Sequence, residues 1–171
     1  RYIRYRNIMI DIKEYNKSVK PTWCPGCGNF AIHMALKNAL SQLDIKPSQT
    51  YITFDIGCNG NGADKINTYA FKGLHGRSIP LAAGVHLANR KFTVISDLGD
   101  GACFHEGLDN LIHAIKSNYD ITILIHNNQN FELKTGHEKI TNDEKKPMYG
   151  QPDKKHEKNK TDAENKSNEK H

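Results

Sequence analysis

The chain has 171 residues, of which 37% are hydrophobic, so it can bury one modest core. No stretch approaches the roughly 20 consecutive apolar residues of a membrane-spanning helix, which predicts a soluble protein with no membrane segment. Lys and Arg exceed Asp and Glu by 24 to 19, but residues 21–140 hold ten of each sign. A core without a basic face argues against nucleic acid binding.

The two ends of the chain differ in composition from its middle. Residues 1–20 carry six basic and two acidic side chains and lack the apolar run of a secretory signal, so we expect an N-terminal extension and a cytoplasmic protein. Residues 141–171 hold fifteen charged side chains and three hydrophobic ones, which predicts a disordered charged tail. The folded domain is therefore expected over residues 21–140.

A loop with two glycines and a proline over residues 23–28 precedes the first predicted helix. Asn29 is the expected N-cap of this helix, and helical spacing predicts a buried stripe of Ile32, Leu36, Leu40 and Leu43.

Three apolar segments then alternate with two helical ones. Strands are expected over 51–56, 92–96 and 121–125, with helices over 79–89 and from 108 to 115. Small residues in the first of these helices predict close packing on a sheet, and the second should bury Leu108, Leu111, Ile112 and Ile115. Glycine-rich loops are expected at 57–60 and 69–77.

Continuous apolar strands separated by helices predict an α/β fold, a parallel sheet covered on both faces. The loops after the strands then lie at one edge, where such sheets bind ligands. Gly99-Asp100-Gly101 and Asn127-Asn128 follow neighbouring strands there. Each motif alone is an ordinary turn, but together their oxygens suit Mg²⁺ that holds a diphosphate. Gly101 would let the backbone approach the phosphate.

The four cysteines suggest metal or redox chemistry in a reducing compartment. Cys24 and Cys27 alone leave zinc, a redox dithiol and two core thiols open, but Cys58 follows a strand at the same edge and could join them on one cluster. Cys103 is expected to be a small buried side chain. His75 and Arg77 could orient a carboxylate or phosphate, although a solvated loop explains them equally well, and His113 and His126 are expected to be satisfied core residues.

Five motifs, in this order and at these intervals, carry a resemblance to a known family. They are Trp23-Cys24-Pro25-Gly26-Cys27-Gly28, Ile56-Gly57-Cys58, Gly73-Leu74-His75-Gly76-Arg77, Gly99-Asp100-Gly101 and Asn127-Asn128-Gln129. Over residues 20–136 the chain resembles the beta subunit of 2-oxoacid:ferredoxin oxidoreductases, in a form truncated or divergent at its C-terminus. The resemblance implies a thiamine diphosphate-binding fold and oxidative decarboxylation of a 2-oxoacid to an acyl-coenzyme A, with electrons passed through a [4Fe-4S] cluster to ferredoxin.

The resemblance also implies roles for single residues. Asp100 and Asn128 would bind Mg²⁺ through side chains and Asn130 through its carbonyl oxygen, while Cys24, Cys27 and Cys58 would bind the cluster. The stretches expected to line thiamine diphosphate contain Ile56, Gly57, Cys58, Asn59, Gly101, Ala102, Glu132 and Leu133. The family's catalytic glutamate comes from the alpha subunit, so no catalytic residue is expected in this chain.

Three departures separate the chain from the family pattern. No fourth cluster cysteine follows the Asn motif, Asn61 stands where the family often has lysine, and Ala102, Glu132 and Lys134 replace the usual residues around the cofactor. Two alternatives therefore stay open: a non-catalytic remnant of the subunit, and an iron-free thiamine diphosphate-dependent decarboxylase or synthase.

Overall fold

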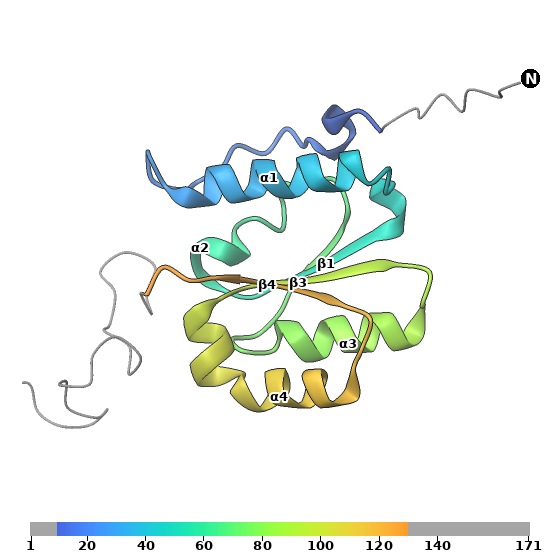
Figure 1. Ribbon diagram of the computed structural model, residues 1–171. Coiled ribbons are helices and arrows are strands. Elements are labelled where there is room, and N and C mark those ends of the chain that lie inside the picture. The colour runs from blue at the N-terminus through green and yellow to red at the C-terminus, as the bar shows by residue number, and fades with distance from the viewer. Residues whose placement is uncertain (1–9, 130–171) are drawn as a thin grey trace, which may run out of the picture. The chain divides into compact units, whose positions relative to one another are not determined.

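A computed structural model describes residues 10–129, which form a four-stranded parallel sheet with helices on both faces (Figure 1). The strands are β1 (Thr50–Phe54), β2 (Tyr69–Lys72), β3 (Thr93–Gly99) and β4 (Thr122–His126), in the order β2-β1-β3-β4. Tyr51 pairs with Tyr69 on one side and with Val94 on the other, and Ile95 pairs with Thr122. The predicted α/β fold with a parallel sheet is confirmed.

Helices cover both faces of this sheet. The helix α1 (Gly28–Gln42) lies on one face together with the short α2 (Gly57–Gly60), whereas α3 (Ser78–Ala88) and α4 (Leu108–Ser117) lie on the other (Figure 1). Shorter pieces are the 3₁₀ turns η1 (Ile12–Tyr15) and η2 (Pro47–Gln49) and a single π-helical segment, η3 (Ala102–Glu106), directly after β3.

Two apolar clusters fill the two sides of the sheet. On the α1 side, Leu36 and Leu40 pack on Ile52, Phe54 and Ile95. On the α3 side, the buried side chains come from α3, from the strand β3 and from the two segments that follow it: Ile79, Leu98, Ala102, Cys103 and Ala114. Since side chains along a strand alternate between faces, β3 contributes Ile95 to the first cluster and Leu98 to the second.

The described structure begins before the expected start at Pro21. Ile10 and Tyr15 are buried in the α1-side core, and the Tyr15 hydroxyl donates a hydrogen bond to the carbonyl oxygen of Ile45. Asn16 forms an antiparallel bridge with Ile66. The expected N-terminal extension thus contributes core residues, whereas the expected tail over 141–171 lies outside the described residues.

The first helix differs from its prediction in two respects. Its N-cap is Cys27 rather than Asn29, because the helix already begins at Gly28. Leu36 and Leu40 are buried as expected, but Ile32 and Leu43 are exposed. Lys37 takes a buried place instead, where its ammonium donates to the Asn16 side chain and burial lowers its pKa.

Two further predictions were wrong. Residues 69–72, expected to be a loop, form β2, an edge strand with mostly exposed side chains and hence without the apolar signal of a central strand. The helix α4 buries only Ala114, while Leu108, Ile112 and Ile115 are exposed and Leu111 is half-buried against the α3-side core. Of the four small residues of α3 that were expected to pack on the sheet, Ala82 and Ala83 are buried, whereas Gly84 and Ala88 are exposed.

Candidate functional site

The carboxyl ends of β1 and β3 mark the place where the sheet changes its winding direction. From β1 the chain passes outward to β2, then returns across β1 to β3 and continues to β4. In open parallel sheets such a switch point opens a crevice for ligands at the carboxyl ends of the strands. The segments at 55–60 and 99–103, both singled out in the sequence, follow the two strands that flank it.

Asp55 organises the segment that follows β1. Its fully buried carboxylate accepts hydrogen bonds from the backbone amide of Ile56 at 2.8 Å and from that of Gly76 at 2.9 Å. Gly57, with φ of +72°, then opens α2 in the left-handed conformation that favours glycine. The expected cofactor residues Ile56–Asn59 therefore form the start of a short helix held by a buried charge, and Ile56 is exposed.

Asp100 brings the carboxyl ends of β3 and β4 together. Its carboxylate, 2% exposed, accepts from the amide of Gly101 at 3.0 Å through Oδ1 and from the amide of Gln129 at 3.1 Å through Oδ2. The Gly-Asp-Gly turn thus contacts the segment that contains Asn128, whose side chain is exposed. Asn130, Glu132 and Leu133 lie outside the described residues.

Gly101 and Ala102 are buried at the start of η3. Single π-helical turns often occur at functional sites, where they move a few side chains out of helical register. Cys103 follows in this turn and is fully buried, as predicted. Burial and the nearby charge of Asp55 raise the pKa of its thiol to about 11, so Cys103 is a thiol and not a thiolate at neutral pH.

The loop with His75 and Arg77 packs tightly against the end of η3. A Cβ atom at Gly76, whose φ is +70°, would lie 2.6 Å from the carbonyl carbon of Glu106, and one at Gly107 would lie 2.6 Å from the carbonyl oxygen of Gly76. His75 is half-buried. The Arg77 guanidinium lies 4.0 Å from the carboxylate of Asp109 and both are exposed, so this pair adds little stability.

The two cysteine-bearing segments are neighbours. The Trp23 indole donates a 2.6 Å hydrogen bond to the carbonyl oxygen of Cys58, and its ring packs edge-on against Phe30 and His33. Cys24 is exposed, and Cys27 and Cys58 are half-buried. Within residues 10–129 no three His, Cys, Asp or Glu side chains are gathered as ligands of a single metal ion.

A polar network behind these segments was not predicted from the sequence. His126, at the end of β4, lies with Nε2 2.7 Å from Asp97 Oδ1 and Nδ1 3.2 Å from Asn29 Oδ1. Asp97 Oδ1 also accepts from the Asn59 side chain at 2.5 Å. His126 is a satisfied residue as expected, but it is half-buried rather than a core residue, and its partners are polar groups from three other elements. The only feature of the sequence that could have indicated this network is the place of His126 directly before the Asn motif.

His33 faces the same region from α1. Burial, with the charge of Lys37 adding to it, lowers the pKa of its imidazole from 6.5 to about 4. His33 is therefore neutral at physiological pH. His113, the other histidine expected in the core, is instead exposed on α4.

Comparisons with known proteins agree with the fold. Residues 55–166 match the model of the family described as thiamine pyrophosphate enzyme, C-terminal TPP binding domain, and the chain belongs to this family. It is 37% identical over 125 residues to the beta subunit of 2-oxoacid:ferredoxin oxidoreductase 1 from Aeropyrum pernix, a match that covers 73% of this chain and 39% of that one.

Two further similarities extend this finding. The 2-oxoglutarate oxidoreductase subunit KorB of Mycobacterium tuberculosis is 33% identical over 124 residues, 72% of this chain and 33% of that one. A solved 2-oxoglutarate:ferredoxin oxidoreductase from Magnetococcus marinus, with 2-oxoglutarate, coenzyme A and succinyl-CoA bound, superposes with a TM-score of 0.74 at 28% identity, over 78% of this chain and 46% of that chain.

These similarities confirm the resemblance to beta subunits of 2-oxoacid:ferredoxin oxidoreductases. The chain spans about two fifths of the length of the A. pernix relative and a third of the M. tuberculosis one. In the part of the chain that the structure describes, no helix is both long and apolar enough to cross a bilayer.

Proposed function

We propose that this chain binds thiamine diphosphate and Mg²⁺ as the beta subunit of a cytoplasmic 2-oxoacid:ferredoxin oxidoreductase. The contact between the Asp100 carboxylate and the amide of Gln129 carries the proposal, because it joins the Gly-Asp-Gly turn to the Asn motif. A buried carboxylate and an exposed carboxamide at one sheet edge are hard oxygen donors, which fit Mg²⁺ that completes its shell with phosphate and water.

Each candidate site residue has a defined role in this proposal. Asp100 and Asn128 would hold Mg²⁺ through side chains and Asn130 through its carbonyl oxygen. Ile56–Asn59, Gly101 and Ala102, together with Glu132 and Leu133, would line the cofactor. When bound, thiamine diphosphate supplies the electron-accepting ring for decarboxylation of a 2-oxoacid. Asp55 contributes by fixing the start of α2 against the Gly76 loop.

The cysteines complete the proposed electron path. Cys24, Cys27 and Cys58 lie on two neighbouring segments that Trp23 joins, and we assign them as this chain's ligands to a [4Fe-4S] cluster. Cys103 is the fourth cysteine of the chain, but it packs in the α3-side core with Leu98 and Ala114, so we do not assign it to the cluster. Electrons would leave through the cluster to ferredoxin, and coenzyme A would accept the acyl group. His75 and Arg77 are assigned to substrate or phosphate contacts.

The test is reconstitution with an alpha subunit. The full chain is copurified anaerobically with a candidate alpha subunit, and reduction of ferredoxin is followed with a panel of 2-oxoacids. We expect reduction that requires a 2-oxoacid, coenzyme A and thiamine diphosphate, that is lost in Cys58→Ser and that is retained in the matched variant Cys103→Ser. Thiamine diphosphate binding without ferredoxin reduction would instead support the iron-free or non-catalytic alternatives.

A further inference from the structure

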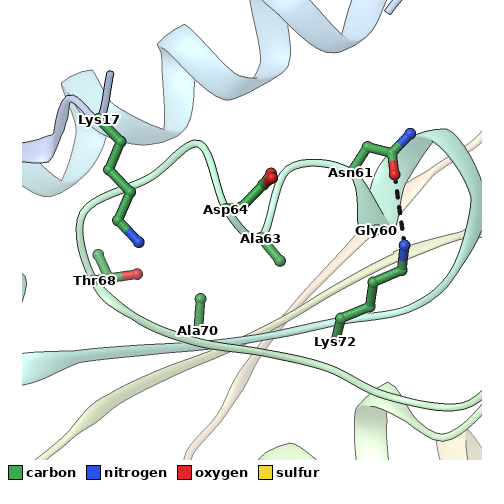
Figure 2. A pocket seen from close by; sticks show the side chains of 8 residues that line it. All are labelled: Lys17, Gly60, Asn61, Ala63, Asp64, Thr68, Ala70 and Lys72. Carbon is green, nitrogen blue, oxygen red and sulfur yellow. Dashed lines mark hydrogen bonds between the residues drawn. The ribbon is translucent and has the colours of Figure 1, made fainter. Parts of the chain in front are cut away.

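A pocket of about 460 Å³ lies beside the edge strand β2, apart from the carboxylate and Asn motif of the proposed cofactor site. Figure 2 shows two lysines on opposite sides of it, Lys17 from the segment after η1 and Lys72 from the end of β2. Asn61, directly after α2, and Thr68, just before β2, add an amide and a hydroxyl. Such a volume suits a small organic molecule rather than a single ion.

The charges around the pocket do not cancel. Asp64 is its only lining carboxylate, and that oxygen lies 2.6 Å from the ammonium of Lys65, which is 4% exposed. This hydrogen bond, with smaller contributions from the charges of Lys65 and Lys17, lowers the pKa of Asp64. Within residues 10–129 neither Lys17 nor Lys72 forms a salt bridge. The pocket therefore has an excess of positive charge at neutral pH.

Backbone contacts hold the Lys17 side of the pocket in place. The amide of Asn67 donates to the carbonyl oxygen of Tyr15 at 2.9 Å, and the Asn67 side chain donates to that of Glu14 at 2.7 Å. Together with the bridge between Asn16 and Ile66, these bonds fasten the segment before Lys17 to the loop that leads into β2. This wall is formed before any ligand enters.

The other wall positions Lys72. Its ammonium donates to the Asn61 side-chain oxygen at 3.5 Å, as the dashed line in Figure 2 shows. Its side chain passes close to Gly60, where an added Cβ atom would lie 2.9 Å from Lys72 Cε and 2.1 Å from the carbonyl oxygen of Asp55. The glycine thus leaves room for the lysine stem to run along α2 with its charged end at the pocket.

We propose that this pocket binds a small organic dianion, with one carboxylate or phosphate group at Lys17 and the other at Lys72. Two cations at opposite ends of one pocket favour a ligand with an anionic group at each end, and the Asn61 side-chain amide can donate to a polar atom between them. The Thr68 hydroxyl donates to the carbonyl oxygen of Tyr69 and can accept a hydrogen bond from the ligand. The proposal rests on these side chains alone. The pocket lining contains neither Asp100 nor Asn128, although it includes Gly60, directly after the expected cofactor residues Ile56–Asn59, so binding is measured without thiamine diphosphate.

The test measures anion binding by the full chain without thiamine diphosphate. Succinate and glycerol phosphate serve as dianionic probes from two chemical sources, with acetate as the monoanionic comparison, in calorimetric titrations at low salt. The variants are Lys17→Gln and Lys72→Gln, with Lys72→Arg to keep the charge. The matched control is Lys116→Gln, an exposed lysine at the end of α4, on the opposite face of the sheet from α1 (Figure 1).

We expect one dianion to bind saturably and more tightly than acetate. Each Lys→Gln change should weaken it at least about tenfold, as expected for the loss of one hydrogen bond to a charged group. Lys72→Arg and Lys116→Gln should bind as the parent chain does. Tighter binding of succinate or of glycerol phosphate supports the proposal and identifies the source. Absence of binding by both, or equal affinity in the glutamine variants and the control, overturns it.

Discussion

The Trp23 indole donates a hydrogen bond of 2.6 Å to the carbonyl oxygen of Cys58, across 35 positions of sequence. Trp23 is 8% exposed, so this bond forms in a largely dry environment between the first cysteine segment and the third cysteine. Phe30 and His33 hold the ring from the side of α1 at centroid distances of 5.2 and 5.4 Å. One aromatic side chain therefore links the first cysteine segment directly to the residue that carries the third cysteine.

Replacement of this indole tests that dependence. Trp23→Phe removes the donor and part of the buried volume, so we expect the free energy of unfolding to fall by about 1 to 3 kcal/mol. Urea titration measures it. Tyr69→Phe, which removes one hydroxyl from an exposed aromatic residue, is the matched control and should change stability by less than about 0.5 kcal/mol. Equal stability of the two variants would contradict the assignment.

The metal assignment concerns Asp100. Asp100→Ala should abolish measurable binding of thiamine diphosphate in the presence of Mg²⁺, because a neutral side chain leaves the cation without its carboxylate. Asp100→Asn, which keeps the shape, should fail in the same way and so separates charge from packing. Calorimetry provides the measurement, with Asp109→Ala on the exposed side of α4 as the control. Unchanged affinity in the Asp100 variants would refute the site.

The cluster assignment predicts a distinct pattern of iron loss. Three thiolates leave one iron open to water and oxygen, so anaerobic reconstitution of the chain alone should give substoichiometric, air-labile iron. Iron and sulfide should be lost in Cys24→Ser and Cys58→Ser but kept in Cys103→Ser, whose thiol is buried. A stable cluster at full occupancy that requires Cys103 would show that the fourth ligand is wrongly assigned.

The lowered pKa of His33 predicts a dependence of stability on pH. Its imidazole titrates near 4 in the folded chain and near 6.5 in the unfolded chain, so below pH 6.5 the unfolded state binds a proton that the folded state does not. Stability should therefore fall between pH 6.5 and 4, by at most about 3 kcal/mol from this group. Urea titrations at pH 7 and 4.5 should show a smaller loss for His33→Gln. His113→Gln, exposed on α4, should match the parent chain.

Substitution of two glycines by alanine should have opposite effects on stability, because Gly76 lies against η3 whereas Gly84 has open space around it. Gly76→Ala would force a Cβ atom to within 2.6 Å of the Glu106 backbone at a φ of +70°, so it should lower the melting temperature markedly. Gly84→Ala, within α3 with nothing within 4 Å of the new atom, should stabilise the chain by about 0.5 to 1 kcal/mol. Thermal unfolding measures both. Similar melting temperatures would show that the loop yields to the new atom.

The sequence alone was sufficient to predict those helices and strands that have an apolar pattern of their own. The strands β1, β3 and β4 and the helices α1, α3 and α4 were expected within a few residues, because apolar runs and helical spacing are local properties. The edge strand β2 was missed because its exposed Tyr69 and Phe71 lie among glycines and polar residues. Its strand character comes from pairing with β1, which is a long-range contact.

For the candidate site, short sequence motifs predicted which segments meet, but they did not predict the hydrogen-bond partners of buried polar side chains. The Gly-Asp-Gly turn and the Asn motif were expected to meet, and the contact from Asp100 to Gln129 confirms their proximity. The polar network of Asp97, Asn59 and His126 was not expected, since no short motif contains residues so far apart. The burial of α4 was mispredicted because amphipathic spacing shows that a helix has an apolar side but not which side the sheet covers.

The network of Asn29, Asn59, Asp97 and His126 has a consequence for the order of events in folding. Asn29 and His126 are 97 residues apart, and His126 ends the last strand of the described sheet. During synthesis the cysteine segments and β3 emerge first, yet the Asp97 carboxylate lacks its imidazole partner until β4 has followed. Closure of the network is therefore a late step. The segment that carries the third cysteine gains its full set of buried hydrogen bonds only when the whole sheet has been made.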